Sequence, residues 1–153
     1  MGGNRPPGLG PQGRARMRSD RRAAILDTSY IVRYLTDDPP DMAERATEVI
    51  ESDEILVLSE MVLLETAYVL SSVYRVPRDV VVDSLSELVQ RANLRLATLP
   101  KDRVLEALRL CRGSSRVSFT DALVWAQAVE MGAERIYAFD GKFPSRGVSI
   151  IGM

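Results

Sequence analysis

Short apolar runs that alternate with amphipathic helices constrain the fold of this chain more than any other feature of its sequence. The first example is residues 23–35, AAILDTSYIVRYL, where three apolar residues lead into an acid and then into apolar positions at helical spacing. This pattern is typical of a short buried strand, a sharp turn and a helix. Further strand-like runs occupy residues 54–59, 94–99, 134–140 and 148–152, with helices predicted between most of them. The alternation predicts an α/β fold with a mostly parallel sheet.

Capping residues mark the expected ends of the helices. Asp38 is expected to cap a helix that begins in the following Pro-Pro pair and runs to about Ser52. Ser59 should cap the helix that follows the second strand-like run. Gly113 and Gly132 should end the last two helices.

Charge and composition separate a basic leader from the rest of the chain. Residues 1–22 contain six arginines and one acid, a net charge of +5, so the remainder of the 153-residue chain carries −6. Residues 1–21 are rich in Gly, Pro and Arg and offer almost nothing to bury, so we expect a disordered leader followed by one domain over residues 22–153. Met17 is a candidate for the true start, and the alternative is an arm that contacts RNA.

The scarcity of cysteine and histidine limits the chemistry available to the chain. Cys111 is the single cysteine and there is no histidine, which excludes an internal disulfide, histidine base catalysis and zinc sites that need imidazole. Any bound metal must therefore be held by oxygen. One cysteine fits a reducing, cytoplasmic location. No apolar run approaches the roughly 20 residues that span a bilayer, so no membrane association is expected.

Two acids follow strand-like runs. Asp27 lies at the carboxyl end of the first run, where open α/β sheets bind ligands, although a helix cap explains an aspartate there equally well. Asp140 ends the run at residues 134–140, and its structural alternative is an Asp-Gly turn. In a single parallel sheet both acids would open onto the same edge.

A third acid interrupts an apolar helix stripe. Glu65 shares its helix face with Met61, Val62, Tyr68 and Val69, which predicts a carboxylate in the middle of a buried face. An unpaired buried charge is costly, so Glu65 should find a cation or a proton there. The structural alternatives are an ion pair with an arginine or an acid at the edge of the apolar stripe.

The fourth acid stands at the start of a helix. Asp121 follows Ser118 at capping-box spacing, which is a complete structural explanation for an acid there. It also shares a helix face with Val124 and Trp125, which should turn inward, and Trp125 is expected in the core.

A shared site would explain all four acids together. A cluster of carboxylates repels itself unless a divalent cation is present, and Mg²⁺ and Mn²⁺ prefer oxygen ligands of this kind. Such a cation orients a phosphodiester, activates a water molecule and stabilises the leaving oxygen. The sequence therefore indicates a metal-dependent enzyme that acts on phosphodiester bonds.

Four segments resemble, in order, the motifs of the PIN-domain ribonucleases, most closely the VapC-like toxins of type II toxin–antitoxin systems. These segments are ILDTSYIVRYL, LLETAYVL, FTDALVWAQA and YAFDGKF, and the resemblance covers about residues 24–152. It implies four catalytic acids, which are Asp27, Glu65, Asp121 and Asp140. Asp27 and Asp121 would hold the metal, with Glu65 and Asp140 as further possible ligands. Ser29 and Thr120 would support them.

The resemblance also implies an architecture and partners. It predicts a three-layer α/β/α fold with a mostly parallel central sheet, Mg²⁺- or Mn²⁺-dependent cleavage of RNA, a homodimer and a cognate antitoxin protein. A catalytically inactive PIN-like module that binds RNA or protein is the alternative. An aspartyl phosphatase is disfavoured because Ser29 stands where that chemistry needs a second aspartate, and a phosphoacceptor receiver domain is disfavoured because the strand-like runs at 54–59 and 94–99 end without an acid.

Three basic residues close to the acids are candidates for contacts with RNA phosphates. Arg112 and Arg116 precede the segment that contains Asp121, and Lys142 follows Asp140. The alternative is that all three belong to solvated loops, where exposed basic residues are common.

Overall fold

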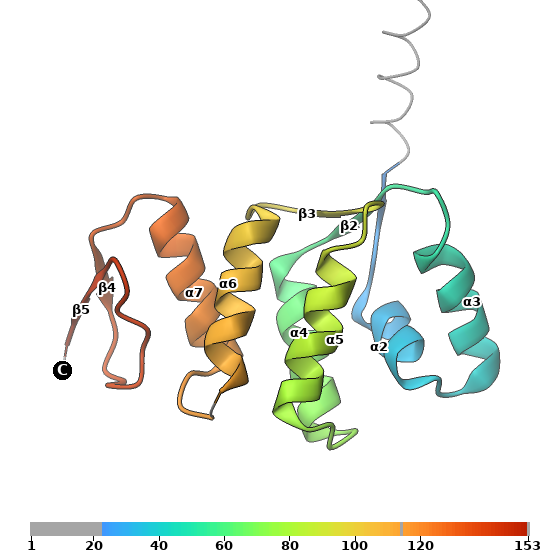
Figure 1. Ribbon diagram of the computed structural model, residues 1–153, viewed down its shortest axis with the longest axis horizontal. Coiled ribbons are helices and arrows are strands. Elements are labelled where there is room, and N and C mark those ends of the chain that lie inside the picture. The colour runs from blue at the N-terminus through green and yellow to red at the C-terminus, as the bar shows by residue number, and fades with distance from the viewer. Residues whose placement is uncertain (1–22, 114, 153) are drawn as a thin grey trace, which may run out of the picture.

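The computed structural model describes residues 23–113 and 115–152 (Figure 1). The predicted leader, residues 1–21, and the candidate start at Met17 lie outside the described residues. The described helices are α2 (Thr28–Thr36), α3 (Pro40–Ile50), α4 (Glu60–Ser72), α5 (Arg78–Val89), α6 (Lys101–Arg112) and α7 (Phe119–Glu130). The described strands are β1 (Ala24–Ile25), β2 (Leu56–Leu58), β3 (Leu94–Leu96), β4 (Arg135–Tyr137) and β5 (Ser149–Ile151).

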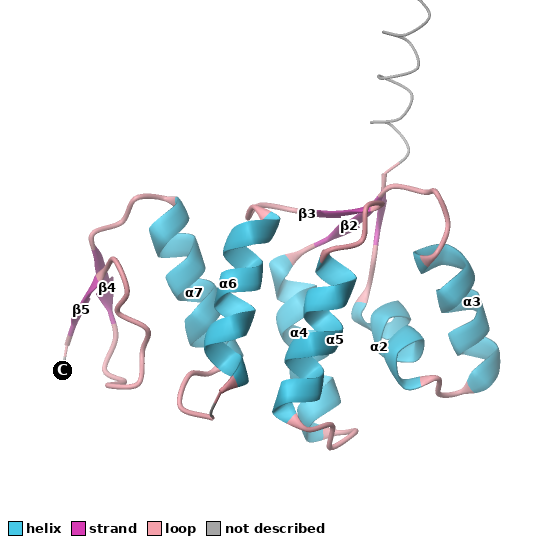
Figure 2. Ribbon diagram, viewed as in Figure 1, coloured by secondary structure: helices cyan, strands magenta, loops and turns pink. Residues whose placement is uncertain are grey.

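The strands form two separate parallel sheets. The first has the order β1-β2-β3, with Ala24 opposite Leu56, and the second pairs β4 with β5, with Arg135 opposite Ser149. Parallel strands flanked by helices confirm the predicted α/β class and agree with a three-layer α/β/α fold. Within the described residues the strands divide into these two sheets: β4 and β5 lie at the left-hand end of the long axis, whereas β1, β2 and β3 lie above α4 and α5, with α3 beyond them (Figure 2).

Two serine caps predicted from the sequence are confirmed. Ser59 accepts a hydrogen bond from the backbone N–H of Val62 at 3.2 Å, and Ser118 accepts one from the N–H of Asp121 at 3.0 Å. Gly132 follows α7 with a positive φ of 70°, the conformation in which glycine commonly ends a helix. These local signals place the starts of α4 and α7 and the end of α7.

The predicted cap at Asp38 is wrong. Helix α3 begins at Pro40, and Pro39 occupies the cap position with an extended backbone and no side-chain hydrogen bond to the helix. Asp38 lies one residue too far out to cap α3, and its carboxylate instead accepts a hydrogen bond from the hydroxyl of Tyr74 at 3.3 Å. The proline at the first helical position leaves one fewer N–H to be capped.

Trp125 anchors the part of the core that lies under α6 and α7. Its side chain is 1% exposed, which confirms the prediction that it belongs to the core, and its indole N–H donates to the carbonyl of Arg146 at 2.8 Å. The guanidinium of Arg103 on α6 lies 5.9 Å from the centre of the indole ring. Helices α6 and α7 pack side by side. We call α6, α7, β4 and β5 the C-terminal unit.

Several large apolar side chains are exposed. They include Ile25 of β1, Met61 and Tyr68 of α4, Tyr137 at the end of β4 and Phe139 just after it. A strand in a parallel sheet is normally covered on both faces, so the 77% exposure of Ile25 marks a face of β1 that no described element covers. None of the described helices is long and apolar enough to cross a membrane.

Candidate active site

Asp27 is held in place by the residue two positions further on. It caps α2, and its Oδ2 accepts hydrogen bonds from the backbone N–H of Ser29 at 3.1 Å and from the Ser29 hydroxyl at 2.6 Å. These bonds, the hydroxyl first, lower the pKa of the exposed Asp27 carboxyl below its ordinary value. The cap and the predicted site residue are therefore the same ionised, oriented carboxylate.

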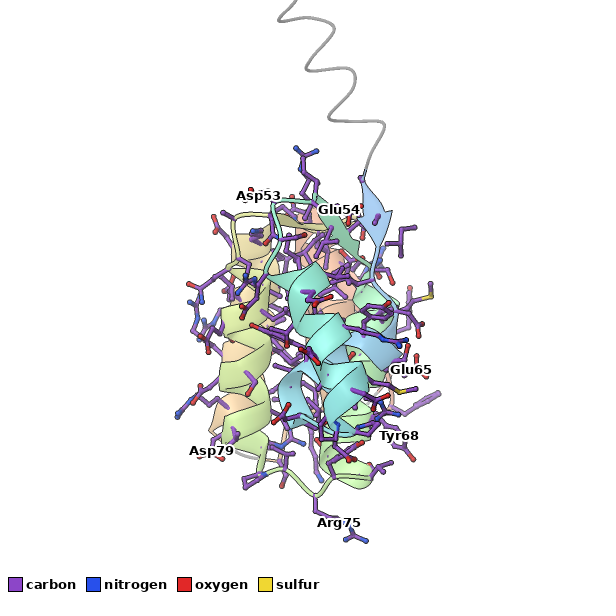
Figure 3. The ribbon with its side chains drawn as sticks, turned by 90° about the vertical axis from the view of Figure 1, so that its right-hand side faces the viewer. Asp53, Glu54, Glu65, Tyr68, Arg75 and Asp79 are labelled. Carbon is purple, nitrogen blue, oxygen red and sulfur yellow. The ribbon has the colours of Figure 1, made fainter. Side chains whose placement is uncertain are left out.

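The side chain of Glu65, on α4, contacts Thr28, the residue that follows Asp27. The hydroxyl of Thr28 donates to Glu65 Oε2 at 2.7 Å, which ties the middle of α4 to the first residue of α2 (Figure 3 labels Glu65). Glu65 is exposed, not in the middle of a buried face: Met61 and Tyr68 on its face are exposed, whereas Val62 and Val69 are half-buried. The alternative of an acid at the edge of the apolar stripe describes Glu65 better.

An open cleft lies beside Asp27 and Glu65. Its volume is about 390 Å³, and Arg33 and Tyr74 line it together with both acids. Arg33 Nη1 donates to the Tyr74 hydroxyl at 2.9 Å, whereas the Nε of Arg33 is buried without a hydrogen-bond partner. Within the described residues no lysine or arginine forms an ion pair with Asp27 or Glu65. The cleft thus combines two unneutralised carboxylates with one guanidinium.

Arg33 was not predicted as a site residue from the sequence. It lies on an amphipathic helix, where an exposed arginine is common and does not indicate a function. Its spacing could have indicated the site, because Arg33 stands four residues after Ser29 and so shares the helix face that begins beside Asp27. Arg33 also lines a neighbouring hollow of about 280 Å³ together with Arg45, which adds a second positive charge near the cleft.

The other two acids lie in the C-terminal unit, away from this cleft. Asp121 is in the first turn of α7, where its N–H is capped by Ser118. Asp140 follows β4, and its Oδ1 accepts a hydrogen bond from the backbone N–H of Lys142 at 2.8 Å. In Figure 1, β4 and β5 lie at the left-hand end, and α7 stands between them and α4, against which it packs. The cleft joins Asp27 to Glu65, but among the described residues no group of three or more acids is arranged to hold a metal ion.

The remaining candidates have varied surroundings. Arg112 makes two hydrogen bonds of 2.8 Å to the carboxylate of Asp83, so both charges are partly neutralised, although both side chains are more than half exposed. Arg116 and Lys142 are exposed residues in loops, and Thr120 is exposed in the first turn of α7 beside Asp121. None of these contacts tests the proposed roles.

The oxygen ligands in the cleft are of the kind that a hard divalent cation prefers, but they include only two of the four predicted acids. Among the described residues no group of three or more Asp, Glu or Cys side chains is arranged to hold a metal ion. Asp27 and Glu65 offer carboxylate oxygens, with the hydroxyls of Ser29 and Thr28 beside them, and Mg²⁺ and Mn²⁺ prefer such ligands. The cleft therefore offers two carboxylates and two hydroxyls as oxygen donors.

The sequence matches the PIN domain family over residues 24–148. The chain therefore belongs to the PIN domain family, and this membership supports a nuclease function in general terms, with divalent metal ions as the usual cofactors of such domains. No curated protein was found to match the sequence.

Proposed function

We propose that this chain is a metal-dependent endoribonuclease that cleaves RNA phosphodiester bonds, and that it is the toxin of a toxin–antitoxin pair with a cognate antitoxin protein. The observation that carries the nuclease proposal is the cleft beside Asp27 and Glu65, where two carboxylates without ion-pair partners among the described residues face the same space as Arg33. A carboxylate pair suits a divalent cation, and a guanidinium suits a phosphate group. Together they suit a phosphodiester substrate.

Each residue of the cleft has a part in this proposal. Asp27 and Glu65, joined by Asp121 and Asp140, would hold Mg²⁺ or Mn²⁺, which when bound supplies positive charge and a more acidic water molecule. The hydrogen bonds from Ser29 keep Asp27 ionised, and the Thr28 hydroxyl orients Glu65. Arg33, held by Tyr74, would contact a phosphate of the RNA.

We expect purified protein to cleave mixed RNAs in Mg²⁺ or Mn²⁺ and to stop in excess EDTA. Chelation should leave the far-ultraviolet circular dichroism unchanged, because the core is apolar and contains no metal ligand among its described residues. The measurement is gel analysis of the RNA fragments with and without the chelator. Cleavage at full rate in excess EDTA would refute the metal-dependent mechanism.

A catalytically inactive PIN-like module that binds RNA or protein is the second candidate. It is favoured by the lack, among the described residues, of any group of three or more acids arranged to hold a metal ion, because two carboxylates hold a cation less firmly than four. RNA binding without any cleavage in Mg²⁺ or Mn²⁺ would support this candidate over the nuclease.

Arg33→Ala should weaken RNA binding and reduce its salt dependence, whereas Arg109→Ala should change the salt dependence little. One lost phosphate contact lowers the slope of log affinity against log salt by about 0.7 to 0.9. Arg109 is the matched control because it is an exposed arginine of α6 with no proposed part in the site. The slopes come from fluorescence anisotropy titrations of labelled RNA at several salt concentrations in EDTA. Equal slopes for Arg33→Ala and the parent would remove Arg33 from the interface, leaving Arg112, Arg116 and Lys142 as candidates.

A further inference from the structure

We propose that the hollow between α2 and α3 binds the base of one RNA nucleotide beside the cleavage site, and that it prefers guanine. Tyr30 stacks on the base, and Arg45 contacts its edge. This inference rests on the proposed function only for RNA as the ligand, because the base preference can be measured as binding without any cleavage.

The hollow is formed by one face of each helix. Helices α2 and α3 pack side by side at the right-hand end of the molecule (Figure 1). Residues three and four positions apart share a helix face, so α2 presents Tyr30 and Arg33 to the hollow, and α3 presents Met42, Arg45 and the buried Ala46. The volume of this space, which we call the α2–α3 hollow, is about 280 Å³. Pockets that enclose a whole drug-sized ligand have about 300–1,000 Å³, so the α2–α3 hollow suits a single base.

The α2–α3 hollow adjoins the cleft that contains Asp27 and Glu65. Ser29 and Arg33 line both spaces, so the two are neighbours on the surface. The hydroxyl of Ser29 also donates to Asp27 at 2.6 Å. An RNA strand with a phosphate in the cleft beside Arg33 therefore has an adjacent base within reach of the hollow.

The residues that line the α2–α3 hollow include two guanidiniums and no carboxylate. Among the described residues, no acid forms an ion pair with Arg45. A second hollow of about 280 Å³, between α2 and α5, differs because Glu87 lines it together with Arg91. Uncompensated positive charge attracts electron-rich and anionic ligands. Of these two hollows, the one between α2 and α3 therefore suits a nucleotide.

Tyr30 and Met42 give the α2–α3 hollow an apolar surface. Tyr30 is 42% exposed and Met42 is 50% exposed, although both line a space between packed helices. Proteins that bind single-stranded RNA stack unpaired bases on aromatic side chains, and every base has a face for this contact. Tyr30 therefore supplies affinity for a base without selecting which base it is.

The hydrogen-bonding groups favour guanine over the other bases. Guanine has two acceptors, O6 and N7, on one edge, and a single guanidinium can donate to both. Adenine and cytosine present an amino group that needs an acceptor, and no carboxylate or side-chain amide lines the α2–α3 hollow. Arg33 is shared with the cleft and suits the phosphate, which leaves Arg45 for the edge of the base.

A nucleotide matches the two neighbouring spaces better than a protein segment does. One nucleotide carries a phosphate for Arg33 and a base for Tyr30 and Arg45, joined by a sugar. A protein segment would need two separate side chains, one acidic and one apolar, at matching positions. The pairing of an aromatic ring with guanidiniums beside a phosphodiester cleft therefore favours single-stranded RNA.

Binding of short RNAs in EDTA tests the base preference directly. The probes are labelled uridine octamers with one guanosine, adenosine or cytidine at the centre, and fluorescence anisotropy gives their affinities. The parent should bind the guanosine octamer at least about fivefold more tightly than the adenosine octamer, the lower end of the range for one bidentate arginine–guanine pair. Equal affinities for the octamers would overturn the proposal.

Arg45→Ala should reduce the affinity for the guanosine octamer to that for the adenosine octamer. The slope of log affinity against log salt should stay close to that of the parent, because the lost contact is to a base. Arg109→Ala, which also removes one exposed arginine, is the matched control and should keep the preference. An unchanged preference in Arg45→Ala would overturn the proposal. A reduced slope with the preference intact would also overturn it, because Arg45 would then contact a phosphate.

Tyr30→Ala should weaken the binding of every octamer by about fivefold or more, because stacking does not depend on the identity of the base. Tyr30→Phe keeps the ring and should bind RNA as the parent does. Circular dichroism checks that both variants are folded. A folded Tyr30→Ala variant with the affinity of the parent would show that the base does not stack on Tyr30, against the proposal.

Cleavage separates failure of this inference from failure of the proposed nuclease. In Mg²⁺ the parent should cut RNA next to guanosines, and Arg45→Ala should cut without that preference. Cuts by the parent at positions unrelated to guanosine would overturn the base site and leave the nuclease standing. Guanosine-selective binding without any cleavage would refute the nuclease and leave the base site standing. If no octamer bound and none was cut, both proposals would fail, and the hollow would be left to a protein partner.

Discussion

Asp27→Asn should reduce RNA cleavage by at least about a hundredfold and leave the metal-free protein about as stable as the parent. Asparagine caps helices as well as aspartate does, so its side-chain oxygen can still accept the hydrogen bonds from Ser29. Loss of the negative charge should lower the cleavage rate, because removing one preoriented electrostatic group from an active site typically reduces the rate by about 10²- to 10³-fold. The same variant should no longer arrest growth when it is produced in a bacterial host.

Thermal melting separates this catalytic role from a structural one. Asp41→Asn is the matched control, because Asp41 is an exposed acid in the first turn of α3. Mg²⁺ at a hundredfold excess over its dissociation constant should stabilise the parent and the control by about 2.7 kcal/mol and Asp27→Asn by much less. The metal-site interpretation fails if Asp27→Asn melts well below the parent in EDTA and gains as much from Mg²⁺.

Trp125→Ala should lower the free energy of unfolding by about 3–5 kcal/mol, the range for replacing a buried tryptophan by alanine. The indole is 1% exposed, and its removal would also leave the carbonyl of Arg146 without its donor. Small domains are stable by only about 5–15 kcal/mol, so this one change would remove much of the margin. Urea titration followed by circular dichroism gives the value.

Two further variants identify the source of that loss. Trp125→Phe keeps much of the ring volume but removes the N–H, so it should cost less than the alanine variant and report the hydrogen bond to Arg146. Met131→Ala, which truncates an exposed side chain at the end of α7, should be nearly neutral. If Met131→Ala and Trp125→Ala lowered the free energy of unfolding by similar amounts, burial of the indole would not be what anchors the C-terminal unit.

Local signals in the sequence located most of the secondary structure. Ser59 and Ser118 cap their helices as predicted, because a serine side chain satisfies an N–H within its own turn and needs no distant partner. The prediction of a strand, a turn and a helix around Asp27 was also correct, because Asp27 caps α2 through a hydrogen bond within its own turn. Asp38 was misassigned as a cap because Pro39 takes the cap position and Pro40, which has no N–H to be capped, begins the helix.

The pairing of strands and the packing of helices that are distant in sequence could not be predicted from such local signals. The apolar run that ends at Asp27 indicates a strand buried on both faces, yet Ile25 is exposed because no described element packs on its face of β1. Nothing local to residues 134–140 specifies which strand lies beside them. The importance of Arg33 depended on the cleft between α2 and α4, which exists only after the helices pack.

The double role of Asp27, as helix cap and as proposed site residue, has a consequence for how this domain changes over generations. The hydrogen bonds from Ser29 need only an oxygen acceptor, which asparagine also provides, whereas the proposed site needs the negative charge. An aspartate codon becomes an asparagine codon by the exchange of one nucleotide. A single mutation would therefore silence the proposed enzyme and leave the start of α2 intact.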